Sequence, residues 1–127
     1  MRPGYWNSDR GIGTFDVNGE VQLTDYARVT FIKGWSKSTL PSQLHVLKIS
    51  NRRVIHMDAE LFLSTIYLLC LIGPIIRDND IMIFDEFADS IHEFRAFEAF
   101  RQIIGIEAER IVASRGNQSA FRLRVKQ

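Results

Sequence analysis

The chain has 127 residues, of which 46% are apolar and 11% are aromatic, a composition typical of one globular domain and not of a disordered segment. Sixteen basic and fifteen acidic side chains leave a formal net charge of +1, which rules out a strong nucleic-acid binder as the default interpretation, because such binding rests on concentrated positive charge. The one cysteine, Cys70, excludes an internal disulfide and a cysteine-rich metal site, and it fits a reducing, cytoplasmic location.

No segment of the chain predicts a membrane span or a secretory leader. The longest uncharged stretch, residues 61–76, is short for a bilayer and is interrupted by Gly73 and Pro74. Nothing after Met1 resembles the apolar core of a signal peptide.

The first part of the chain predicts little regular structure. Residues 1–27 are punctuated by glycine, asparagine and aspartate, and we expect a loop-rich segment there. Residues 28–35 (RVTFIKGW) alternate and are rich in β-branched and aromatic side chains, which predicts a strand. A short helical turn is expected over residues 39–42.

The middle of the chain predicts two strands separated by a helix. Residues 53–57 are typical of a short buried strand, and residues 59–72 are apolar on nearly all sides, which indicates a buried helix. After a turn at residues 78–80, residues 81–84 (IMIF) form a continuous apolar run typical of a strand covered on both faces.

The last part predicts a helix and a hairpin. Residues 89–104 form an amphipathic pattern that Asp89 or Ser90 could cap. Residues 109–114 and 120–125 predict an antiparallel pair of strands. The whole pattern favours an α/β fold with an open, mostly parallel sheet that ends in an antiparallel hairpin.

Acidic side chains follow two of the predicted strands. Residues 54–127 carry eleven acidic and eight basic side chains, a net charge of −3. Asp58 follows one buried strand, and Asp85 and Glu86 follow the next. Because ligands bind at the carboxyl ends of parallel strands, we expect these three carboxylates at the ligand edge of the sheet, where a hard cation such as Mg²⁺ would relieve their repulsion.

Simpler interpretations of these residues stay open. Acidic side chains after a strand also stabilise the N-terminus of the next helix, and the pattern alone does not separate that role from metal binding. His56 is more often a hydrogen-bonded core residue at such a position than a base, and Cys70 is expected to be inert packing.

An ATPase is a weaker alternative. An apolar strand that ends in Asp85-Glu86 would suit a Walker B motif, but that assignment needs a phosphate-binding loop. The candidate segment, residues 31–39, has Phe31 and Ser36 where that loop requires glycine.

Five short motifs occur in one order along the chain. They are Phe31-Ile32-Lys33-Gly34-Trp35, Thr39-Leu40-Pro41, residues 56–65 (HMDAELFLST), residues 83–87 (IFDEF) and residues 92–97 (HEFRAF). Together they resemble the macrocin O-methyltransferase (TylF-type) family of class I S-adenosylmethionine-dependent methyltransferases, over roughly residues 11–125. Glu60 and Phe62 stand where the family pattern has aspartate and tyrosine.

The resemblance implies a Rossmann-like sheet and a set of site residues. In that family the matching acids, Asp58, Asp85 and Glu86, bind Mg²⁺, which orients hydroxyl groups of a sugar or natural product for methyl transfer. Asp58 is then also the candidate catalytic base. The loop Gly34-Trp35-Ser36 would lie beside the adenine of S-adenosylmethionine.

The front of that family's fold has no counterpart in this sequence. The glycine-rich cofactor loop should follow a strand and open a helix, and Gly11-Ile12-Gly13 does neither. We therefore expect residues 28–127 to be the C-terminal half of such a domain, inactive alone. The alternative is a non-catalytic α/β module that pairs through its open sheet edge, with itself or with a missing N-terminal half.

Overall fold

The computed structural model describes residues 27–49, 53–88, 90–114 and 117–126. The chain divides into two compact units, residues 1–34 and residues 35–127. The second unit contains, in order, α1 (Ser36–Ile49), β1 (Val54–Met57), α2 (Phe62–Ile72), the 3-10 turn η1 (Gly73–Ile75), β2 (Ile81–Phe84), α3 (Glu93–Ile104), β3 (Glu107–Ala113) and β4 (Ser119–Arg124).

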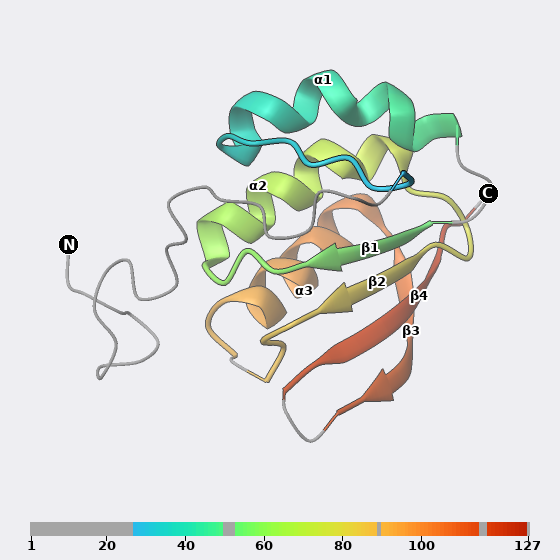
Figure 1. The fold of residues 1–127 in the computed structure, drawn as a ribbon. Coiled ribbons are helices and arrows are strands. Elements are labelled where there is room, and N and C mark those ends of the chain that lie inside the picture. The colour runs from blue at the N-terminus through green and yellow to red at the C-terminus, as the bar shows by residue number, and fades with distance from the viewer. Residues whose placement is uncertain (1–26, 50–52, 89, 115–116, 127) are drawn as a thin grey trace, which may run out of the picture. The chain divides into compact units, whose positions relative to one another are not determined.

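The four described strands form one sheet with the order β1-β2-β4-β3 (Figure 1). β1 and β2 are parallel, whereas β4 is antiparallel to both of its neighbours. The predicted α/β class and the C-terminal antiparallel hairpin are therefore confirmed. Three of these strands run in one direction, but only the β1–β2 pair is parallel, because the reversed strand β4 lies between β2 and β3.

The core lies between one face of the sheet and two helices, α2 and α3 (Figure 1). On β2, Met82 and Phe84 are fully buried while Ile81 and Ile83 are only half-buried, which corrects the expectation of a strand covered equally on both faces. Four phenylalanine rings pack around the end of β2 with centroids 4.8–6.2 Å apart; they are Phe84, Phe87, Phe97 and Phe121.

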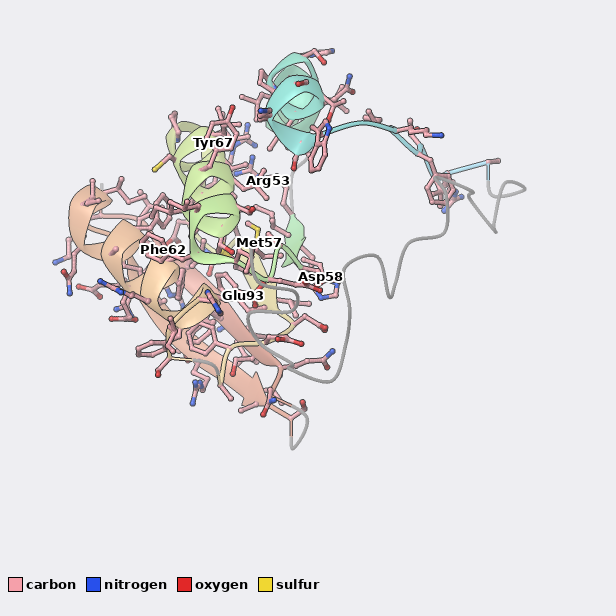
Figure 2. All side chains as sticks on the ribbon, turned by 90° about the vertical axis from the view of Figure 1, so that its left-hand side faces the viewer. Arg53, Met57, Asp58, Phe62, Tyr67 and Glu93 are labelled. Carbon is pink, nitrogen blue, oxygen red and sulfur yellow. The ribbon has the colours of Figure 1, made fainter. Side chains whose placement is uncertain are left out.

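α1 is a helix of 14 residues where the sequence predicts only a turn. The prediction fell short because Pro41 lies inside the helix, and proline cannot donate to the carbonyl four residues earlier. That carbonyl belongs to Lys37, and it accepts a hydrogen bond from the Tyr67 hydroxyl of α2 (O···O 3.3 Å). Tyr67 lies on the side of α2 next to α1 (Figure 2), so a neighbouring helix supplies the donor that the proline lacks.

The strand predicted over residues 28–35 is wrong. Residues 29–33 have no regular secondary structure, and residues 36 onward are helical. The apolar side chains Val29, Phe31 and Ile32 are each about half exposed, at 49%, 51% and 47%. None of the described strands pairs with this segment, so no hydrogen bonds between strands stabilise an extended conformation there. Residues 1–26 of the predicted loop-rich segment lie outside the described residues.

The helices α2 and α3 both begin later than predicted. α2 starts at Phe62 instead of residue 59, and α3 starts at Glu93 instead of residue 89, with His92 at its N-cap. The proposed cap Asp89 lies outside the described residues, and no side chain caps α3. α2 is also not buried on all sides: Leu63 is 76% exposed, and Cys70 is exposed instead of packed inside. In the described part of the chain, no helix is long and apolar enough to cross a membrane.

A buried ion pair joins the segments that precede β1 and β2. Arg53 and Asp80 are 6% and 3% exposed, and the Arg53 guanidinium donates to both carboxylate oxygens of Asp80. Arg53 also donates to the carbonyls of Leu47 in α1 and Ile75 in η1. One guanidinium therefore holds α1, η1 and the start of the parallel pair together.

Replacing Arg53 with methionine should destabilise the fold by about 3–5 kcal/mol, because Asp80 would be left as a buried charge without its partner. Urea unfolding followed by circular dichroism measures this loss. The double variant Arg53→Met/Asp80→Leu should recover part of it, since neither charge then remains buried alone.

The matched control is Lys126→Met, which breaks a pair with Glu107 whose side chains are 76% and 64% exposed. An exposed pair contributes about 1 kcal/mol or less. Equal losses for Arg53→Met and Lys126→Met would contradict the role assigned to the buried pair.

Candidate functional site

The parallel pair β1–β2 brings its two following loops to one edge of the sheet. Met57, the last residue of β1, is in register with Phe84, the last residue of β2. The pairing extends one step further, because the Asp85 N–H donates to the Met57 carbonyl (N···O 3.3 Å). Asp58 and Asp85 therefore both follow directly at the carboxyl ends of neighbouring strands, as the sequence predicted.

Glu60 is a fourth acid at this edge, and the charges of the other three act on it. Its φ of 58° is in the left-handed region, and it belongs to the turn between β1 and α2. Burial raises the pKa of Glu60, and the negative charges of Asp58, Glu86 and Asp85 raise it further. We call Asp58, Glu60, Asp85 and Glu86 the acid edge.

A fifth carboxylate, Glu93, lies behind the acid edge at the start of α3. Its side chain is fully buried, at 0% exposed, and Figure 2 labels it near Asp58. One carboxylate oxygen accepts the N–H of Ala59 (3.3 Å) and the other accepts the N–H of Glu86 (3.0 Å). Burial raises the pKa of Glu93, whereas the backbone donors of Glu86, Ala59 and Glu60 oppose that rise.

His56 is not the core histidine that its position in the strand predicts. Its side chain is 53% exposed, and its Nε2 lies 3.7 Å from the Asp85 Oδ1. The same Asp85 oxygen accepts a hydrogen bond from the Gln118 amide (2.5 Å), just before β4. The prediction failed because α2 and α3 cover one face of the sheet, and Val54 and His56 of β1 lie on the opposite, exposed face.

The acid edge fits magnesium in its chemistry but not as an assembled coordination shell. Carboxylate oxygens are the donors that Mg²⁺ prefers. Within the described residues, however, no three acidic, histidine or cysteine side chains form a group that could hold a metal ion. Asp85 instead engages Gln118, so these carboxylates would have to reorient to share an ion.

The predicted adenine loop begins α1. The Trp35 carbonyl accepts the N–H groups of Ser38 and Thr39 (2.8 and 3.1 Å), which starts the helix. The Trp35 side chain is 80% exposed and Ser36 is exposed. Gly34 has a φ of 143°, a conformation that side chains rarely adopt, so its lack of a side chain is required there.

Sequence analysis missed Glu60 and Glu93 as members of the site. Glu60 was expected to lie in a helix, where it would point away from the strand end. Its left-handed conformation instead keeps it in the loop beside Asp58. Glu93 precedes the buried residues Ala96, Phe97 and Phe100 by three, four and seven positions, and this helical spacing is the sequence signal that places it on the inner face.

Comparison with known proteins adds no identification. No protein-family model, curated protein or solved structure matches this chain. The geometry of the described residues therefore carries the functional argument alone.

The raised pKa of Glu93 predicts how stability varies with pH. The folded chain binds the Glu93 proton more tightly than the unfolded chain, so this stabilisation is complete at low pH. It is lost as the pH rises from the ordinary value of 4.5 through the folded pKa. Each tenfold ratio of the two proton affinities corresponds to about 1.4 kcal/mol.

Unfolding free energies of the wild type and of Glu93→Gln, measured from pH 4 to pH 8, isolate this effect. We expect the wild type to lose stability relative to the variant as the pH rises above about 4.5. A difference that is flat, or that grows in favour of the wild type, would contradict a raised pKa at Glu93.

Proposed function

We propose that residues 28–127 are the C-terminal half of an S-adenosylmethionine-dependent, magnesium-assisted O-methyltransferase that acts on a hydroxyl group of a sugar or natural product. The proposal includes a Rossmann-like sheet and a reducing, cytoplasmic setting. Support comes from the parallel pair β1–β2, with its acids at the carboxyl ends, and from the antiparallel hairpin β3–β4. The acceptor is a small molecule, not a nucleic acid.

The observation that carries this proposal is the position of Asp58 and Asp85 directly after the adjacent carboxyl ends of the parallel strands β1 and β2. In methyl transfer the acceptor oxygen forms a bond to the methyl carbon, the sulfonium–carbon bond breaks, and the sulfur leaves as a neutral thioether. The hydroxyl proton must go to a base. Asp58 is the proposed base. Glu60 is a second carboxyl group at this edge, and burial together with the charges of Asp58, Glu86 and Asp85 raises its pKa.

Magnesium, if bound, would be held by Asp58, Asp85 and Glu86. The chemistry that the ion supplies is to lower the pKa of a bound hydroxyl group. In this chain the loop after β1 carries the carboxylate that accepts the proton, and Glu93 accepts hydrogen bonds from the loops after β1 and β2. Gly34, Trp35 and Ser36 remain the proposed contacts for the adenine of S-adenosylmethionine.

Magnesium should stabilise the chain if the acid edge binds it. At an ion concentration ten times the Kd, linkage adds about 1.4 kcal/mol to the unfolding free energy. Asp85→Asn should remove that gain. Glu109→Gln, on β3, removes one carboxylate from an exposed ion-pair network and should keep the gain. Thermal unfolding of the wild type and of both variants, with and without millimolar MgCl₂, measures these effects.

The cofactor is tested separately on the same samples. Amide NMR spectra recorded with S-adenosylmethionine should show shifts at residues 34–36 and not across β3. A folded chain that shows neither magnesium stabilisation nor shifts at these residues would overturn the proposed function.

The open edge of β1 favours a second candidate function, a non-catalytic module that pairs with another copy of itself. The N–H groups of Ile81 and Asp85 donate to the carbonyls of Arg53 and Met57. In β1, the backbone N–H and C=O groups of the odd-numbered residues therefore point toward β2. The backbone groups of Val54 and His56 then point outward, and no described strand pairs with them. Val54 is 63% exposed beside this free edge.

Val54→Pro tests that pairing without touching the β1–β2 ladder. Proline removes an N–H that faces away from β2, which edge strands tolerate, whereas any strand added at this edge would lose a hydrogen bond. Val54→Thr keeps the N–H and the branched shape, so it is the matched control. Sedimentation equilibrium should show a dimer for the wild type and Val54→Thr, with at least a tenfold weaker dimer for Val54→Pro. A wild type that stays monomeric at high concentration would exclude this candidate.

A further inference from the structure

Glu93 bridges the two loops that carry the acid edge. The Ala59 amide belongs to the loop after β1, between Asp58 and Glu60, and the Glu86 amide belongs to the loop after β2. Each donates to a different oxygen of the same carboxylate, over 3.3 and 3.0 Å. The side chain spans from the first turn of α3 to both loops, so its position relates one loop to the other.

This arrangement needs a carboxylate specifically. Burying a charged carboxylate is costly, and among the described residues no Lys, Arg or His forms an ion pair with Glu93 to offset that cost. A glutamine of the same length has one acceptor oxygen and one NH₂ group, and that NH₂ group would face a second N–H donor. Aspartate keeps both oxygens but is one methylene shorter. Only glutamate combines two acceptors with the required reach.

A role confined to the stability of α3 does not account for these contacts. An acidic side chain in the first turn of a helix is favourable next to the helix dipole, but it can provide that benefit while exposed to solvent. Glu93 is instead fully buried and directs both oxygens at backbone outside α3.

We propose that Glu93 is a positioning residue, which fixes the spacing between Asp58–Glu60 and Asp85–Glu86 by accepting backbone N–H groups from both loops. The inference rests on the proposed function, in which these acids act together and their spacing therefore matters. Glu93 itself contacts neither the substrate nor the cofactor.

Hydrogen–deuterium exchange of the full chain, followed by NMR, tests the bridge directly. In the wild type the amides of Ala59 and Glu86 should be protected. In Glu93→Gln and in Glu93→Asp that protection should fall by about tenfold to a hundredfold, while the Asp85 amide, which bonds to Met57, stays protected. Glu98→Gln removes a carboxylate from the same helix, where it pairs with Arg101, and should leave all three amides unchanged.

The functional part is tested with magnesium alone, by calorimetric titration of the same variants. Loss of an outer-shell residue should weaken the ion's binding about 10–100-fold, whereas Glu98→Gln should bind as the wild type does. If the wild type binds and Glu93→Gln binds equally well, the positioning role is overturned and the proposed function stands.

If the wild type binds no magnesium, the metal part of the proposed function fails and the exchange data decide about the bridge. Should both Glu93 variants fail to fold, the wild-type spectrum still decides. Ala59 and Glu86 amides that exchange freely in the folded chain would overturn the bridge.

Discussion

The Arg53–Asp80 ion pair is the contact on which the rest of the second unit depends. β1 and β2 are only four residues long each, and two such short strands contribute few ladder hydrogen bonds. The guanidinium fixes where both strands begin and ties them to α1 and η1. With the starting points fixed, the register Val54–Ile81 to Met57–Phe84 follows, and so does the meeting of Asp58 and Asp85 at the far end.

The parallel pair therefore has a buried charged group at each end, with different consequences. At the start of the strands a cation and an anion neutralise each other, and the pair is nearly sealed from solvent. At the far end the Glu93 carboxyl group accepts hydrogen bonds from backbone amides, and the side chains in front of it are also acidic. The first arrangement stabilises the fold. The second places several acidic side chains at one edge of the sheet. Clustering of like charges is unfavourable for the fold and is common at functional sites.

The sequence predicted those elements whose signals are local. The apolar run Ile81–Phe84, the hairpin and the acids after the two strands were all found, because each depends on a short pattern of apolar and polar residues. The prediction from sequence failed where a contact between residues far apart in the chain decides the local structure. Residues 28–35 look like a strand but find no described partner strand, and Glu60 leaves the predicted helix for a left-handed turn. Glu93 contacts Glu86 seven positions away and Ala59 34 positions away, and no spacing rule reveals the second contact.

The hydrogen bond from Tyr67 to Lys37 makes the effect of a substitution at position 67 depend on which residue occupies position 41. While Pro41 is present, the hydroxyl of Tyr67 satisfies a carbonyl that has lost its helical donor, and removing that hydroxyl costs this exposed hydrogen bond, about 1 kcal/mol or less. If Pro41 were first replaced by alanine, the helix would supply its own donor and phenylalanine at position 67 would become nearly neutral. The cost of changing Tyr67 therefore depends on whether Pro41 has already been replaced. Related chains should carry proline and tyrosine together or lose the proline first.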